Sequence, residues 1–214
     1  IVEGMLAAVW KDVLGVDVDP LRAAEATDGH ATTMELALHD RTLRAAVVCT
    51  PPATHVPIAL DCLKAGLAVF VEKPLALSMD GVPELLEAAA GKVAMGACNL
   101  RFAYGLDAGP PPQRVQPLRL AASKPLRDWR PGAEAYRENG IVLEMAWHEL
   151  DLAYALAGPF AAMDAKVTED RAELLVRHEA GGLTTIVAAW GADAPTYRHM
   201  ATDGPVFAPD LSDR

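Results

Sequence analysis

The 214-residue sequence lacks several features that mark whole classes of protein. It has no apolar run near the ~18 residues that a transmembrane helix needs, and its start does not have the form of a signal peptide. Its formal net charge is −10, because 29 Asp and Glu outnumber 19 Lys and Arg. Non-specific nucleic-acid binding needs a basic face. We therefore expect no membrane association and no nucleic-acid partner.

Cysteines and aromatic residues are also scarce. The three cysteines, Cys49, Cys62 and Cys98, have no metal-site spacing and cannot all pair in disulfides. We expect buried thiols in a reducing compartment, so the expected location is cytoplasmic. Aromatic residues make up 6% of a chain that is 51% hydrophobic, which predicts an aliphatic core.

Short apolar segments alternate with helical patterns through the first half of the chain. The predicted strands are residues 13–17, 44–50, 67–71 and 93–97, and the predicted helices are residues 1–11, 20–27, 33–39, 55–65 and 83–90. This alternation indicates βαβ units and a parallel sheet. No capping residue precedes the first helix, so we expect the chain to begin inside a motif whose first strand is missing.

The pattern changes after residue 98. A loop rich in proline and glycine is expected at 105–117, a strand at 118–122, a loop at 123–139, a helix at 142–156, and a hairpin formed by 171–178 and 183–190 around glycines. The fold class is therefore predicted as α/β. A Rossmann-type parallel-sheet domain at 1–98 is followed by a smaller α+β domain at 99–214 with a largely antiparallel sheet.

Polar residues follow three of the predicted strands. Asp17 ends the second strand expected of a dinucleotide fold, where an acid accepts hydrogen bonds from ribose hydroxyls and repels a 2′-phosphate. Since no arginine directly follows Asp17, NAD is preferred over NADP; the alternative is a solvated loop aspartate. Thr50 and the Glu72–Lys73–Pro74 segment follow two further strands, at the sheet edge where α/β folds bind ligands.

A second group of chemical side chains lies on the helix predicted at 142–156. Glu144, His148 and Asp151 are spaced i, i+4 and i+7, on one helix face. A carboxylate beside a histidine raises its basicity and orients its ring. The alternatives are an ordinary surface pair with a solvated Asp151, or a metal site formed by the three side chains. Because no further ligand cluster accompanies them, no metal is expected.

Together these segments resemble the glucose-fructose oxidoreductase / inositol dehydrogenase / rhizopine catabolism (Gfo/Idh/MocA) oxidoreductase family. The resemblance rests on VDVDPLRA at 16–23, AVVCTPPATH at 46–55, AGLAVFVEKPLA at 65–76, NLRF at 99–102, WR at 129–130 and NGIVLEMAWHELD at 139–151. It covers most of the chain, and the Glu-Lys-Pro segment is its most specific part.

The resemblance implies an NAD(P)-dependent oxidoreductase that transfers hydride between nicotinamide and a hydroxyl or carbonyl carbon of a sugar, cyclitol or related compound. It implies a homodimer or homotetramer formed through the second-domain sheet, with a small polyol or sugar as substrate. Its expected catalytic residues are Lys73, His148 and Glu144; its cofactor-binding residues are Asp17, Thr50, Pro51, His55, Glu72, Lys73 and Asn99; its substrate-binding residues are Arg101, Arg130 and Asp151.

Three departures from the family pattern keep other functions open. The Gly-x-Gly-x-x-Gly turn is absent, aspartate is usual at the position of Glu144, and the usual Gly-Gly-Gly is here Glu138-Asn139-Gly140. One alternative is a non-catalytic dinucleotide-binding regulatory or sensor protein of the same fold. Another is a Rossmann-type enzyme whose second domain performs non-redox chemistry.

Overall fold

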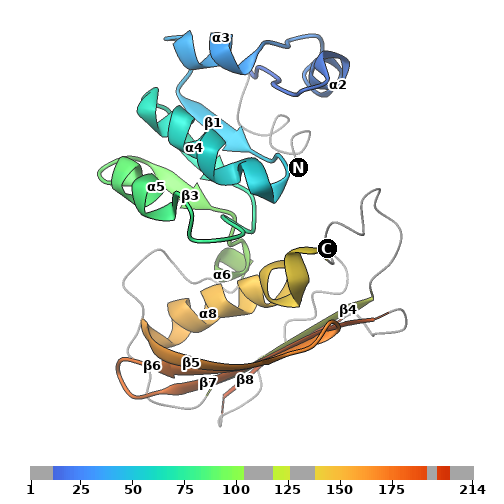
Figure 1. Cartoon of the computed structure of the whole chain (residues 1–214), viewed down its shortest axis with the longest axis vertical. Helices are drawn as coiled ribbons and strands as arrows, with labels where there is room; N and C mark the ends of the chain where they lie inside the picture. Colours follow the sequence, from blue (N-terminus) through green and yellow to red (C-terminus); the bar gives the residue numbers. More distant parts are fainter. Residues whose placement is uncertain (1–11, 104–117, 126–137, 192–196, 203–214) are drawn as a thin grey trace. The chain divides into compact units, whose positions relative to one another are not determined.

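The computed structural model describes residues 12–103, 118–125, 138–191 and 197–202 (Figure 1). The chain divides into two compact units. Unit 1 comprises Ile1–Glu72 and Ser78–Met95, and unit 2 comprises Lys73–Leu77 and Gly96–Arg214. The helix expected at 1–11 and the loop expected at 105–117 lie outside the described residues.

The helices of unit 1 begin and end close to their predicted positions. They are α2 (Pro20–Ala26), α3 (Met34–His39), η1 (Pro52–Thr54, a 3₁₀ turn), α4 (His55–Lys64) and α5 (Val82–Ala89). Asp19 caps α2 by accepting from the Leu21 amide at 3.0 Å, ahead of a proline in the first turn. Gly66, with φ of +89°, follows α4 and lets the chain reverse into the next strand.

The sheet of unit 1 contains β1 (Ala45–Val48), β2 (Ala68–Val71) and β3 (Ala94–Gly96), in the order β1-β2-β3. The β1 and β2 strands pair in parallel, from Ala45 opposite Ala68 to Val48 opposite Val71. The Val69 amide donates to the Val93 carbonyl at 3.0 Å, just before β3. These pairings confirm the predicted Rossmann-type parallel sheet.

The strand predicted at 13–17 is reduced to a single parallel bridge between Gly15 and Ala31. The Gly15 amide donates to the His30 carbonyl at 2.8 Å, and the Thr32 amide donates to the Gly15 carbonyl at 2.9 Å. A Cβ at Gly15 would lie 2.5 Å from the Ala23 carbonyl oxygen, so only glycine lets α2 pack this closely. The first strand of the motif and its glycine turn remain a prediction.

Unit 2 is built on a five-stranded sheet ordered β5-β6-β7-β4-β8. Its strands are β4 (Leu118–Pro125), β5 (Phe160–Val167), β6 (Arg171–His178), β7 (Leu183–Gly191) and β8 (Tyr197–Thr202). Among the described strands of this sheet, only the β4–β7 pair is parallel. The largely antiparallel sheet and the β6–β7 hairpin are confirmed. Neither β5 nor β8 was expected, and β4 extends three residues into the predicted loop at 123–139.

The helix predicted at 142–156 has a different start from the one expected. Residues Val142–Ala146 form a π-helical turn, η2, and α8 (Trp147–Ala157) continues from it. Along one face of the sheet, α8 buries Leu152 and Leu156 against residues such as Leu174 and Ile186 (Figure 1). The helix ends at Gly158, with φ of +89°. A short helix, α6 (Leu100–Ala103), also belongs to this unit.

Among the described helices, none combines the length and the apolar character that crossing a bilayer requires.

Candidate functional site

The parallel register of β1 and β2 brings two of the predicted motifs to one edge of the unit 1 sheet. Val48 ends β1 opposite Val71, which ends β2, so Thr50 and Glu72 follow their strands at the same edge. The Glu72 amide donates to the Val48 carbonyl at 2.8 Å, which extends the pairing by one residue. Ligands of open α/β sheets bind outside this carboxyl edge.

The turn after β1 is held by its own polar groups. His55 Nε2 donates to the Thr50 carbonyl at 2.7 Å, and Thr54 Oγ1 donates to Thr50 Oγ1 at 2.8 Å. His55 is 1% exposed, whereas Pro51 is exposed and Thr50 is partly buried. Thr50 and Pro51 can therefore contact a ligand directly, while the buried ring of His55 fixes the shape of the turn.

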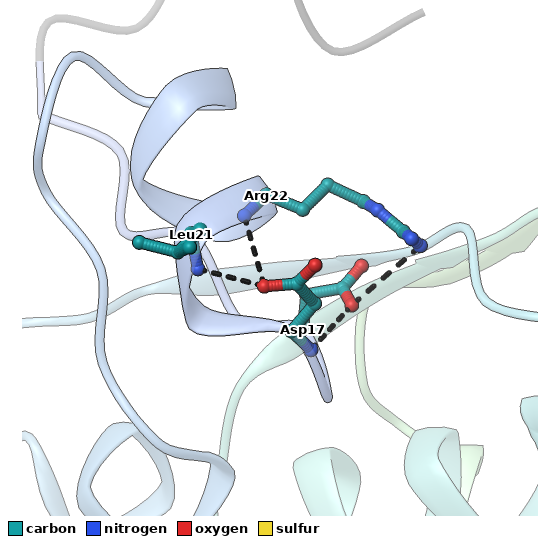
Figure 2. Close-up of polar contacts among 4 residues, drawn as sticks. Asp17, Leu21 and Arg22 are labelled. Carbon is teal, nitrogen blue, oxygen red and sulfur yellow. Dashed lines mark hydrogen bonds and ion pairs between the residues drawn. The ribbon is translucent and has the colours of Figure 1, made fainter.

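Asp17 lies between the Gly15 bridge and the first turn of α2 (Figure 2). Its Oδ1 accepts from the Asp19 amide at 2.9 Å. The guanidinium of Arg22, from the first turn of α2, lies 3.8 Å from the same oxygen. The Asp17 side chain remains 30% exposed, so this carboxylate is accessible and an arginine flanks it. Arg22 was not a predicted site residue, because it lies five positions after Asp17 and no arginine directly follows that aspartate.

Two residues predicted to be catalytic meet in unit 2. Lys73 Nζ donates to Glu144 Oε2 at 2.8 Å, across 71 positions of sequence. The Glu144 side chain is 5% exposed and the Lys73 side chain 24% exposed, so the carboxylate is almost fully removed from water. Asn139 Nδ2 donates to the other oxygen, Oε1, at 2.9 Å. Asn139 was not a predicted site residue, because no periodicity marks a side-chain amide near the start of a helix.

The π-helical turn changes how Glu144 and His148 are related. We expected one α-helix to place Glu144 directly beside His148. Instead, Glu144 lies within η2 and His148 is the second residue of α8, so an α-helical i, i+4 relation does not apply. The carboxylate of Glu144 binds Lys73 and Asn139. Single π-turns of this kind occur frequently at functional sites.

Asp151 pairs with a residue from another element of unit 2. The guanidinium of Arg101, in α6, makes two hydrogen bonds to the Asp151 carboxylate, with 3.0 Å between Nε and Oδ2 and a second bond from Nη2 to Oδ1. The hydrogen bond to Asp151 raises the pKa of Arg101. Both side chains are largely buried, so their charges neutralise each other. Asp151 and Glu144 thus have separate cationic partners, which gives no support to a shared metal.

Two predicted site residues remain, Asn99 and Arg130. Asn99 is exposed at the start of α6, and Arg130 lies outside the described residues. Cys98, next to Asn99, is a protonated thiol: burial and the charge of Asp151 raise its pKa to about 11.

These observations can be compared with known proteins. Residues 15–98 match the profile of GFO_IDH_MocA, described as an oxidoreductase family with an NAD-binding Rossmann fold. Over these residues the chain is similar to the Gfo/Idh/MocA oxidoreductase family. The matched segment spans the Gly15 bridge, both strand-end motifs and β3, so the predicted resemblance to this family is confirmed for this part of the chain.

Two curated relatives are inositol 2-dehydrogenases. The protein from Burkholderia multivorans is 36% identical over 78 residues, which are 34% of this chain and 23% of the relative. The protein from Rubrobacter xylanophilus is 26% identical over 139 residues, which are 64% of this chain and 35% of the relative. These matches span about a quarter to a third of the relatives' length.

Among solved structures, levoglucosan dehydrogenase in complex with NADH and levoglucosan has a TM-score of 0.77 to this chain. The similarity covers 99% of this chain and 69% of that enzyme at 19% identity. At this identity the likeness shows that the two proteins share a fold, including both units of the present chain.

Proposed function

We propose that the protein is an NAD-dependent dehydrogenase or reductase acting on a CH–OH group of a sugar, cyclitol or related compound. The observation that carries this proposal is the Lys73–Glu144 ion pair. Lys73 directly follows Glu72, and consecutive Cα atoms are only ~3.8 Å apart. The paired lysine thus follows directly in the chain a residue at the carboxyl edge of the parallel sheet, where we propose that the cofactor binds.

The residues of unit 1 fit a dinucleotide. The exposed Asp17 carboxylate can accept hydrogen bonds from the adenosine ribose hydroxyls. Thr50, Pro51 and Glu72 lie at the sheet edge, where they can contact the cofactor, and His55 supports Thr50. When bound, the nicotinamide would accept a hydride from the substrate carbon or return one to it.

The residues of unit 2 would manage the proton. We assign His148 as the general base that takes the hydroxyl proton during oxidation and returns it during reduction. Lys73 would hydrogen-bond the same substrate oxygen, with its ammonium fixed in place by Glu144. This arrangement requires the polar heads of Lys73 and His148 to lie within roughly 8 Å of each other, within reach of one small molecule.

The Arg101–Asp151 pair bears on the type of substrate. Because the two charges bind each other, these side chains offer no net charge to a ligand. A neutral polyol or sugar, recognised through hydroxyl groups, suits such a site better than an anion does. Asn99 and Arg130 keep their proposed roles at the cofactor and substrate respectively.

We also propose a homodimer or homotetramer formed through the sheet of unit 2. The face opposite α8 carries partly buried aliphatic residues on its middle strands, including Ala121, Leu175 and Val187. A Val187→Arg variant should lower the molar mass measured by light scattering to that of the monomer. An unchanged mass would exclude this face as the interface, and Glu179→Arg, at an exposed turn residue, is the matched control.

The enzymatic proposal is tested by following nicotinamide absorbance with the full-length protein, NAD and a panel of polyols and sugars that includes myo-inositol. We expect reduction of NAD by at least one member, and its loss in Lys73→Met and His148→Ala variants. Cofactor binding without reduction across the panel would instead favour the regulatory or sensor protein.

A further inference from the structure

The carboxylate of Glu144 is bound at both of its oxygens by different donors. Lys73 Nζ reaches Oε2 at 2.8 Å, and Asn139 Nδ2 reaches Oε1 at 2.9 Å. We call the three residues the carboxylate clamp. A single donor would leave the carboxylate free to turn, since the terminal torsion of a glutamate has a broad, roughly two-fold preference. With a donor on each oxygen, the carboxylate plane is fixed.

The two donors differ in how firmly they are themselves held. Lys73 reaches Glu144 at the end of a flexible four-carbon stem. Asn139 has a much shorter side chain, three residues before the start of η2. Asn139 is therefore the less flexible donor of the carboxylate clamp, and it restrains the carboxylate that Lys73 binds.

The backbone between Asn139 and Glu144 is not a regular α-helix. Five residues of a regular α-helix separate two side chains by about 140° around the axis, on different faces. Gly140, directly after Asn139, has φ of +77°, which departs from right-handed helical winding. Glu144 then lies in the π-helical turn η2, which spans Val142–Ala146. The hydrogen bond between Asn139 and Glu144 therefore forms across an irregular stretch of backbone.

We propose that Asn139 is a positioning residue for the reaction: its amide orients the Glu144 carboxylate so that Lys73 Nζ is held where it meets the substrate oxygen. This inference rests on the proposed function for the role of Lys73. The three residues of the carboxylate clamp all belong to unit 2, so their hydrogen bonds do not require a bound cofactor. The geometry can therefore be tested apart from the activity.

The first test is spectroscopic and needs no substrate. In protein with ¹⁵N-labelled lysine, the Lys73 ammonium should give a slowly exchanging signal, assigned by its loss in Lys73→Met. Asn139→Ala should broaden or shift that signal. Glu138→Ala, at the exposed neighbour of Asn139, is the matched control and should leave it unchanged. A Lys73 signal indifferent to Asn139→Ala would overturn the proposal, whatever the protein's activity.

The second test measures turnover. Asn139→Ala should lower kcat about tenfold per folded molecule, with KM for NAD within about twofold of the wild-type value. Asn139→Asp should lose more, because it places a second carboxylate beside Glu144. The double variant Asn139→Asp/Glu144→Gln should have a kcat at least about tenfold higher than Asn139→Asp. The introduced amide can donate to the introduced carboxylate and still accept from Lys73. Wild-type kcat in Asn139→Ala, or no gain in the double variant, would also overturn the proposal.

The two tests separate the possible failures. A full-length protein without dehydrogenase activity, whose Lys73 signal still depends on Asn139, would contradict the proposed function and leave the carboxylate clamp intact. Dehydrogenase activity that is unchanged in Asn139→Ala would contradict the positioning role of Asn139 and leave the proposed function intact.

Discussion

Breaking the Lys73–Glu144 ion pair from its two ends should have unequal effects on stability. The Glu144 side chain is 5% exposed, whereas the Lys73 side chain is 24% exposed. Lys73→Met leaves a buried carboxylate with Asn139 as its remaining donor in the carboxylate clamp. Leaving one member of a buried pair without its partner costs about 3–5 kcal/mol, and the bond to Asn139 places our expectation at the lower end, about 3 kcal/mol.

Removing the negative charge should cost less. In Glu144→Gln the amide oxygen still accepts from Lys73, so a charge–charge bond is replaced by a bond to a neutral acceptor. The difference between these two kinds of bond is about 1 kcal/mol. The Lys73 ammonium can also turn towards water, since part of its surface is already exposed. Lys73→Met should therefore destabilise unit 2 by ~2 kcal/mol more than Glu144→Gln does.

This asymmetry can be measured by urea unfolding. Tryptophan fluorescence reports mainly on unit 2, because three of the four tryptophans, Trp147 and Trp190 among them, belong to unit 2 and Trp10 belongs to unit 1. The free energies of unfolding of the two variants are compared where the dependence on urea concentration is the same for both. Lys64→Met removes an exposed lysine that pairs with Glu84 at the surface, and serves as the control with a change within about 0.5 kcal/mol. Equal losses in the two variants, or a larger loss in Glu144→Gln, would refute the reasoning from burial.

Two further predictions follow from the structure. Asp17→Ser should strengthen NADP binding about tenfold or more, measured by fluorescence titration, because the 2′-phosphate is no longer repelled and Arg22 remains beside the site; the gain should vanish in Asp17→Ser/Arg22→Ala, and a gain that persists there would exclude Arg22 as its cause. With its pKa raised from 9.0 to about 11 by burial and by Asp151, Cys98 should react with iodoacetamide at pH 8 more slowly than a cysteine in a short peptide. The protonated thiol's contribution to stability should be complete below about pH 9 and lost as the pH rises towards 11, and Asp151→Asn should speed the alkylation; labelling at the peptide's rate would contradict this assignment.

The elements that the sequence predicts well are those whose pattern has one physical meaning. The strands β1 and β2 come from short runs of alanine and valine bounded by turn residues, and their parallel register follows from the helix between them. The β6–β7 hairpin is marked by its glycines, and in the structure every second residue of β6 is buried. In contrast, β5 is exposed at all eight positions, so it lacks the alternation by which a half-buried strand is recognised.

The sequence predicted which residues form the candidate site better than it predicted the contacts between them. Spacing on a regular helix suggested that Glu144 acts on His148, but Glu144 lies in a π-turn and its carboxylate binds Lys73 and Asn139. Winding of this kind depends on tertiary contacts and leaves no periodic signal in the sequence. Arg22 could have been found, because it lies one α-helical turn beyond the cap at Asp19, which follows Asp17 closely.

Hydride transfer is tested most directly by following the hydrogen itself. The full-length protein is incubated with NAD and polyols or sugars that carry deuterium on carbon, perdeuterated myo-inositol among them, and the nicotinamide product is analysed by mass spectrometry. We expect NADH that carries one deuterium, formed by the wild-type protein and by Glu138→Ala but not by Lys73→Met. NAD bound but left unreduced by every substrate, or reduced without taking up deuterium, would contradict hydride transfer from the substrate carbon.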